Sequence, residues 1–421
     1  MISPKYLPWV AGLLALSASA ALTPNEQKIA ALVDTQAATF APDLEAAVRI
    51  DSATENLAGV RLMGEHFVKQ LAELGFESRF VELPASTGRA GHLVAEHKGT
   101  KGKRVLLIGH LDTVYPGGTF RREGDIVHGS GVADMKGGDV VIIAALRALH
   151  AAGALEGAQI IVIMTGDEEA VGHPQEVARR DLFDAAKRSD VALAFESAIG
   201  RTGTIARRGS ISWELEVQGV TGHSSGIFSA AMGTGAVFEM ARILQGFYDQ
   251  VRPLDGATIS PALIAAGVEA ELSRTNGTLS GKTNIIPQRA LVRGDLRTVS
   301  AEQLAEAQAR MQAVVKRNLP RTSAVLTFSE GYPAMAPTPE NYALLAQLDE
   351  ASRDLGLGAI TAFDPRGRGA GDIAFVSPPL PGLDGLGLDG PGQHTTEESA
   401  DLRHLPELVK RAAVLIHRLT R

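Results

Sequence analysis

Three short apolar runs in this chain each lead directly into side chains that commonly bind metal ions. The run 105–108 is followed by His110 and Asp112, the run 160–164 by Asp167, Glu168 and Glu169, and the run 191–195 by Glu196. Short apolar runs bounded by glycine and polar residues are typical of buried parallel strands. In an open α/β sheet, ligands bind beyond the carboxyl ends of the strands. We therefore expect three strands to bring their carboxylates and imidazole to one place.

The composition limits the kind of protein this can be. With 421 residues, 45% of them hydrophobic and 21% charged, the chain is long enough for two or three domains with sizeable cores. The formal net charge of −7 gives no reason to expect nucleic acid or an anionic membrane surface as a partner. Histidines and acids grouped in a chain that has no cysteine favour a metal-dependent hydrolase.

The first 20 residues have the form of a secretory signal. One lysine precedes an apolar core at 7–18, and Ala18-Ser-Ala20 forms a small-residue site with predicted cleavage after Ala20. This apolar core is short for a membrane span. An uncleaved membrane anchor remains an alternative, because only one positive charge precedes the apolar core. We expect an exported protein, periplasmic or secreted, that needs no disulfide.

The order of the predicted elements indicates a catalytic domain interrupted by a smaller one. Helices at 26–49, 56–74 and 139–152 accompany strands in the pattern of βαβ units around a mainly parallel sheet. From 210 to 328 the predicted order is β-α-β-β-α-β, which is typical of a ferredoxin-like unit. We therefore predict an α/β fold with an inserted ferredoxin-like α+β lid or dimerisation domain. The predicted divisions are a signal peptide at 1–20, catalytic segments at 21–208 and 336–421, and the insertion at 209–335.

Asp134 and His394 do not follow any of these strands, but both are natural additions to the cluster. Asp134 lies in the loop 129–138, whose glycines let the backbone approach a ligand closely. Taken singly, each candidate also has an ordinary explanation, since Asp134 is a plausible helix N-cap and the acids at 167–169 a plausible solvated turn. The other candidates have ordinary explanations too. His110 and Asp112 could belong to a surface loop, and His223 could be a turn residue. Arg297 could form a surface ion pair, and His394 could be an isolated loop residue.

Taken together, the segments resemble a known family, the dinuclear zinc exopeptidases and amidases that include bacterial glutamate carboxypeptidase, cytosolic aminoacylase and succinyl-diaminopimelate desuccinylase. The resemblance is closest to the glutamate carboxypeptidase type, since Glu rather than Asp stands at position 196. The matching segments occur in the family's order over nearly the whole mature chain: Gly109-His-Leu-Asp-Thr-Val114, Gly129-Ser-Gly-Val-Ala-Asp-Met-Lys-Gly-Gly138, Asp167-Glu-Glu169, Phe195-Glu196, Gly222-His-Ser224, Asn284-Ile-Ile-Pro287 and Gly392-Gln-His394.

The resemblance implies two zinc ions per chain, which cobalt or manganese could replace. His110 and Glu196 would hold one ion and Glu169 and His394 the other, with Asp134 bridging them. Glu168 would be the general base that deprotonates the water between the ions, and Asp112 would orient His110. His223 would stabilise the oxyanion, in dimeric relatives by reaching across from the second subunit. Arg297 and Asn284 would contact the substrate, with Arg297 holding a free α-carboxylate.

These roles predict cleavage of the amide bond to a C-terminal amino acid, in a small peptide or an N-acyl amino acid. The loop Ala170-Val-Gly-His173 departs from the family's commoner sequence without removing a ligand. The stretch 364–372, in a substrate-side region, is unusually rich in Arg and Gly and leaves side-chain specificity open. An aminopeptidase or dipeptidase of the same architecture and a non-catalytic periplasmic binding protein remain as alternatives. A two-metal phosphoesterase is disfavoured, because no phosphate-binding glycine loop with a suitably placed lysine is present.

Overall fold

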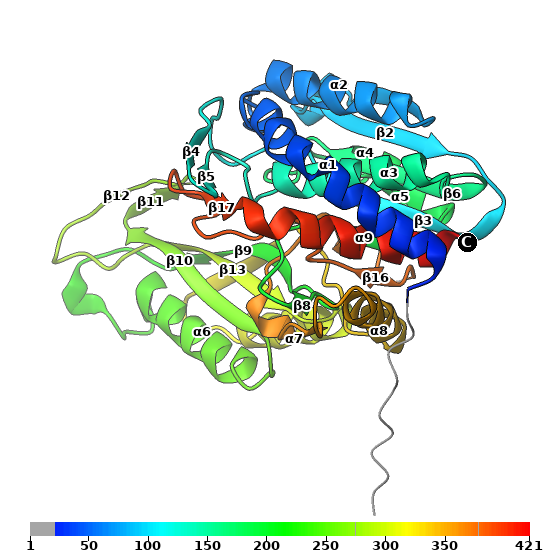
Figure 1. The fold of residues 1–421 in the computed structure, drawn as a ribbon. Coiled ribbons are helices and arrows are strands. Elements are labelled where there is room, and N and C mark those ends of the chain that lie inside the picture. Colours follow the sequence, from blue (N-terminus) through cyan, green and yellow to red (C-terminus); the bar gives the residue numbers. More distant parts are fainter. Residues whose placement is uncertain (1–21, 274, 378) are drawn as a thin grey trace, which may run out of the picture.

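The larger part of the molecule is built on a six-stranded sheet in the order β1-β2-β6-β3-β7-β16 (Figure 1). The computed structural model describes residues 22–273, 275–377 and 379–421, so the predicted signal at 1–20 lies outside the described residues. Strands β6, β3, β7 and β16 are parallel, whereas β2 pairs in antiparallel fashion with both β1 and β6, which confirms a mainly parallel sheet. The strands are β1 (Glu77–Glu82), β2 (Gly91–His97), β3 (Lys101–His110), β6 (Ala158–Thr165), β7 (Val191–Ala194) and β16 (Gly382–Leu383).

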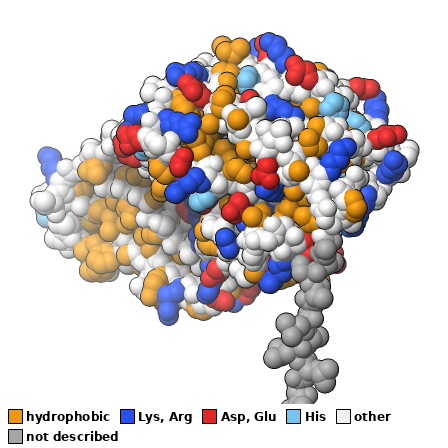
Figure 2. Space-filling model, in the orientation of Figure 1, with side chains coloured by type: hydrophobic (Ala, Val, Ile, Leu, Met, Phe, Trp, Pro, Cys, Tyr) orange, Lys and Arg blue, Asp and Glu red, His pale blue; other side chains and the backbone are white. Residues whose placement is uncertain are grey.

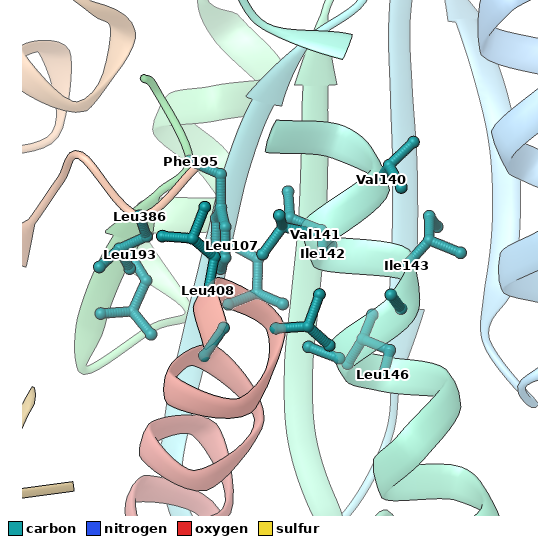
Figure 3. Close-up of a cluster of buried hydrophobic side chains, with 14 of the residues drawn as sticks. Leu107, Val140, Val141, Ile142, Ile143, Leu146, Leu193, Phe195, Leu386 and Leu408 are labelled. Carbon is teal, nitrogen blue, oxygen red and sulfur yellow. The ribbon is translucent and has the colours of Figure 1, made fainter. Parts of the chain in front are cut away.

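Helices cover both faces of this sheet, which is why its central strands form unbroken apolar runs. On one face, Leu107 and Leu193 of the sheet pack with Ile142 and Leu408 of the covering helices (Figure 3). On the opposite face, the alternate strand residues, such as Leu106 and Ile163, belong to a second hydrophobic cluster. The first face carries α1 (Pro24–Val48), α3 (Lys136–Ala152) and α9 (Leu405–Thr420), and the second carries α5 (Arg180–Lys187) and the 3-10 helix η4 (Asp372–Phe375).

A second sheet lies between the two halves of this layered structure in the sequence. Its four strands are antiparallel in the order β10-β13-β9-β14, with α6 and α7 packed on one face around Trp213, Ile243 and Met311. The chain order β-α-β-β-α-β confirms the predicted ferredoxin-like arrangement. The elements are β9 (Gly209–Gln218), α6 (Gly235–Val251), β10 (Thr258–Gly267), β13 (Arg289–Thr298), α7 (Ala301–Val315) and β14 (Ser323–Phe328).

The sequence does not predict the smaller elements, whose short strands carry little apolar alternation. A hairpin of β11 (Glu269–Leu272) and β12 (Gly277–Ser280) follows β10, and β17 (Ser399–Asp401) pairs with β5 (Ile126–His128). The other short elements are β4 (Arg121–Glu123), α4 (Gln175–Ala178), β8 (Thr202–Gly203) and β15 (Thr361–Ala362), whereas α2 (Leu57–Glu73) confirms the helix predicted at 56–74, and α8 (Pro339–Asp354) is a further long helix. Within residues 22–273, 275–377 and 379–421, no helix is both long and apolar enough to cross a membrane.

Candidate metal centre

The ends of two parallel strands and the loop before α3 bring the first set of candidate ligands together. His110 is the last residue of β3, and Glu196 lies two residues beyond the end of β7. His110 Nε2 lies 3.4 Å from Asp134 Oδ1 and 3.6 Å from Glu196 Oε1. One ligand atom from each of these three residues lies within 4.8 Å of the other two, so the set can surround a single cation.

A second set shares Asp134 with the first. His394 Nε2 lies 3.1 Å from Asp134 Oδ2 and 3.3 Å from Glu169 Oε2, and these three residues also form a compact group of potential ligands. The two oxygens of Asp134 therefore face two different donor sets. His394 is at a positive φ of 58° in a loop that follows Gly392 at a φ of 82°. This left-handed backbone is uncommon for a residue other than glycine and is often found at functional sites.

The residues of both sets suit divalent cations. Nε2 of His110 is buried without a hydrogen-bond partner among the described residues, while its Nδ1 lies 3.0 Å from the carbonyl oxygen of Asp112. A proton on Nδ1 would leave Nε2 with a free lone pair for a metal ion. Burial, and after it the charge of Asp134, raise the pKa of Glu196 to about 7, and burial also raises the pKa of Glu169. A cation would relieve this crowding of carboxylates, and imidazole with carboxylate oxygens is a donor set that zinc accepts.

Asp112 holds the backbone of the acidic segment. Its carboxylate is buried and accepts hydrogen bonds from the backbone N–H groups of Glu168 (3.0 Å) and Glu169 (3.1 Å) and from the hydroxyl of Thr54 (2.7 Å). Its Oδ1 lies 3.6 Å from His110 Nδ1, so the backbone carbonyl, not the carboxylate, is within hydrogen-bond distance of that imidazole. Asp112 thus positions one ligand by its carbonyl and another by its side chain.

Glu168 is placed beside the ligands without belonging to either of the two sets that share Asp134. One of its carboxylate oxygens forms a further compact group with His110 and Glu169. Burial, and after it the charge of Glu196, raise the pKa of Glu168 well above its usual value. Its backbone is fixed at both polar groups, because its N–H donates to Asp112 and its carbonyl accepts from the hydroxyl of Tyr332. A half-buried carboxyl group with a raised pKa next to two metal sites suits a general base.

Glu398, to which the sequence assigns no role, supports the loop that carries Asp134. Its buried carboxylate accepts hydrogen bonds from the backbone N–H groups of Gly131 (2.7 Å), Ala133 (2.8 Å) and Asp134 (2.9 Å). Three charge-assisted hydrogen bonds fix the direction of the loop, and with it the carboxylate of Asp134. Glu398 stands only four residues after His394, but its partners lie far away in the sequence.

Arg207 is a second residue that the sequence does not single out. Its guanidinium is buried, pairs with the carboxylate of Asp384, and has Nη2 3.7 Å from Glu196 Oε2. Its Nη1 donates to the backbone carbonyls of Gly369 (3.3 Å) and Ala370 (2.5 Å). Arg207 therefore connects a predicted metal ligand to the Arg- and Gly-rich stretch 364–372.

The three residues predicted to act from the inserted segment lie on the four-stranded sheet and its loops. His223 and Asn284 are exposed neighbours, joined by a hydrogen bond from the N–H of Ser224 to the carbonyl of Asn284 (2.9 Å). Arg297 lies on β13, where its Nε donates to Asp295 (2.8 Å). No ion pair or hydrogen bond of the described residues joins His223, Asn284 or Arg297 to the cluster around Asp134, so their predicted roles in catalysis stay predictions.

Comparison with known proteins identifies the family of this arrangement. The model of peptidase family M20/M25/M40 matches residues 106–418, which include His110, Asp134, Glu169, Glu196 and His394. The chain belongs to this family. It is therefore an enzyme of the metallopeptidase class that hydrolyses peptide or amide bonds, as the sequence predicts.

The chain is 28% identical to carboxypeptidase G2 of Pseudomonas sp. (strain RS-16), over 89% of this chain and 87% of that protein. It is also 28% identical to succinyl-diaminopimelate desuccinylase of Novosphingobium aromaticivorans, over 82% of this chain and 90% of that protein. A tripeptidase structure from Staphylococcus aureus superposes with a TM-score of 0.69 at 18% identity, covering 91% of this chain and 98% of that one. An M20 metallo-carboxypeptidase from Sulfolobus solfataricus gives 0.64 at 14% identity, covering 90% and 98%, so both share the fold of this M20 chain.

Proposed function

We propose that the chain is a di-zinc hydrolase that cleaves the amide bond to the C-terminal amino acid of a small peptide or N-acyl amino acid, as a glutamate carboxypeptidase does. The observation that carries this proposal is the position of Asp134, whose two oxygens face two donor sets. The half-buried carboxyl group of Glu168 lies beside both sets. This is the arrangement that a two-metal hydrolase requires.

The residues of the chain divide the chemistry among them. Two divalent cations held by these residues would supply Lewis acidity, which polarises the scissile carbonyl and makes the attacking water more acidic. A carboxylate oxygen of Glu168 would take the proton from the attacking water and deliver it to the leaving nitrogen. The carboxylate of Asp112 keeps Glu168 in place by accepting a hydrogen bond from the backbone N–H of Glu168. His223 would stabilise the negative charge that develops on the substrate oxygen.

The proposed choice of substrate end rests on positive charge. A free α-carboxylate needs a cationic group, and a guanidinium can bind both of its oxygens at once. Arg297, with Asn284 as a polar neighbour of the substrate, is the residue that the family resemblance assigns to this task. The name of the relative carboxypeptidase G2 supports the same choice, whereas an aminopeptidase or dipeptidase would need an anionic group for a free amine.

We also propose that the protein is exported after cleavage near Ala20.

We further propose that the inserted segment 209–335 mediates a homodimer. Figure 2 shows hydrophobic side chains gathered on the lobe where Figure 1 places α6, β10 and β12. Phe238 on α6, Ile264 on the edge strand β10 and Leu279 on β12 are among the exposed large hydrophobic residues. An exposed edge strand beside apolar side chains is suited to pairing with a second copy.

A substrate panel tests the proposed function. Zinc-loaded protein would be incubated with N-acyl amino acids, with dipeptides blocked at the N-terminus, and with dipeptide amides that have a free amine. We expect release of the C-terminal amino acid from the first two groups and little turnover of the third. Turnover confined to the free-amine substrates would establish the aminopeptidase alternative, and no turnover of any substrate would refute the proposed choice of substrate.

A further inference from the structure

Two stretches of chain lie side by side where the inserted segment joins the larger part of the molecule. Residues 207–210 leave the larger part and residues 332–335 return to it, and the two stretches pair in antiparallel fashion. Ser210 and Tyr332 exchange two backbone hydrogen bonds of 3.0 Å each. A Cβ atom added to Gly209 would lie only 2.9 Å from the carbonyl oxygen of Tyr332, so the two backbones are in close contact. These two stretches, the junction ribbon, fix the path by which the inserted segment is attached.

The side chain of Tyr332 extends from the junction ribbon to the acidic segment that follows β6. Its hydroxyl donates a hydrogen bond to the backbone carbonyl of Glu168 and accepts one from Nη2 of Arg179 at 3.5 Å. Its ring packs against Phe375, with 5.0 Å between the ring centroids. Burial, and after it the charge of Glu168, raise the pKa of Tyr332 well above its usual value, so the hydroxyl keeps the proton that it donates. The inserted segment and Glu168 are therefore joined by one directed hydrogen bond.

The residue before Glu168 is held by a different group. Arg179 is fully buried and donates to the carboxylate of Asp167 and to its carbonyl oxygen (3.3 Å). The same guanidinium donates to the carboxylate of Asp372 at 3.0 Å, so its charge is matched by two acids. Loss of the Tyr332 hydroxyl would therefore free the peptide carbonyl of Glu168 while leaving Asp167 in place.

The direction of the Glu168 side chain depends on its backbone. Its carboxylate forms no hydrogen bond with any residue that the structure describes, whereas its backbone N–H and carbonyl are both bonded, to Asp112 and to Tyr332. A general base must lie within hydrogen-bond reach of the proton that it removes. A misplacement of about 1 Å can lower the rate about 100-fold. The two backbone hydrogen bonds are thus the contacts that keep the base aimed at the metal centre.

We propose that Tyr332 is a positioning residue that holds the backbone of Glu168 and thereby ties the general base to the inserted segment. This inference rests on the proposed function, since it takes Glu168 as the group that receives the proton of the attacking water. Because Tyr332 belongs to the junction ribbon, a displacement of the inserted segment relative to the six-stranded sheet moves its hydroxyl. The base is then correctly placed only while the ribbon keeps its position.

Tyr332→Phe tests this assignment, because it removes the hydroxyl and keeps the ring that packs against Phe375. Release of the C-terminal amino acid from an N-acyl amino acid would be measured with zinc-loaded protein, well below the melting temperature. We expect kcat to fall about 10- to 100-fold, while KM and bound zinc stay close to the wild-type values. Tyr342→Phe is the matched control, since it removes the same atom from a side chain that is 50% exposed on α8, and it should leave kcat unchanged.

A double-mutant cycle with Glu168→Gln separates this role from a merely structural one. If Tyr332 acts through Glu168, adding Tyr332→Phe to Glu168→Gln should change the remaining kcat by less than about twofold. The same fold-loss in both backgrounds would overturn the assignment, as would an unchanged kcat in Tyr332→Phe alone. A loss of kcat that follows a loss of bound zinc would also overturn it. A Glu168→Gln variant with wild-type kcat would refute the proposed function itself, whatever Tyr332→Phe does.

Discussion

Glu398 illustrates how a residue outside the ligand sets governs them. Its carboxylate accepts hydrogen bonds from three backbone N–H groups of the loop that carries Asp134. His110, Glu169 and Glu196 are predictable from sequence because apolar strands lead into them. Glu398 and Arg207 are not, because their hydrogen-bond partners lie far away in the chain and the packing that buries them has no local pattern.

Replacing Glu398 should weaken metal binding without removing a ligand. Glu398→Gln turns one acceptor oxygen into an amide donor facing backbone N–H groups, so the loop should lose its fixed direction. We expect zinc affinity to fall about 10- to 100-fold, as for other residues that orient metal ligands. Competition with a chelator of known affinity measures this, and the exposed neighbour Glu397→Gln serves as control. Equal affinities for the two variants would contradict the role given to Glu398.

At the scale of elements, helix α1 is fastened to α9 through one buried carboxylate. Glu26 closes a capping box with Thr23 at the start of α1 and accepts from Arg418 Nε of α9 at 2.7 Å. Although burial opposes it, the hydrogen bond from Arg418 is the main cause that lowers the pKa of Glu26 from 4.5 to about 2. The helix start is predictable from sequence through its cap, whereas the contact with α9 depends on the tertiary fold.

Glu26→Gln should lower stability at neutral pH while keeping the helix cap, since glutamine also serves in a capping box. The folded-state pKa lies below the unfolded one, so the contribution of Glu26 is complete above pH 4.5 and is lost as the pH falls towards 2. We expect the variant to be less stable by about 2 kcal/mol at pH 7 and to match the wild type near pH 2.

Urea unfolding of metal-free protein across this pH range measures the difference. Glu45→Gln on the same helix removes an exposed pair with Arg49, whose side chains are 41% and 56% exposed, and should cost less than about 0.5 kcal/mol. A wild-type advantage over Glu26→Gln that persists unchanged at pH 2 would contradict the pKa argument.

At the scale of the whole molecule, the exposed position of His223 has a consequence for assembly. His223 bonds to Ser225 at 2.8 Å and forms no contact with the metal cluster within the described part of its own chain. If the proposed homodimer brings His223 to the site of the second subunit, two inactive variants should complement each other. We expect a mixture of Glu168→Gln and His223→Ala, exchanged into hybrid dimers, to regain about a quarter of wild-type activity, because each hybrid has one complete site.

If activity does not recover in a sample shown to contain hybrid dimers, His223 acts on the site of its own subunit.

The sequence predicts the two sheets and their order along the chain because each sheet has its own hydrophobic periodicity. It leaves the relation of subunits open, since that depends on complementary surfaces rather than on local patterns.

The most direct test of the account combines metal content with the rate of amide hydrolysis for the wild type and Glu168→Gln. The account predicts that chelator-treated wild type loses activity and regains it with zinc. It also predicts that Glu168→Gln retains bound zinc while kcat falls by about 100- to 10,000-fold, the contribution of a general base. A Glu168→Gln variant that binds zinc and keeps wild-type kcat, or a metal-free wild type that stays fully active, would contradict the central claim.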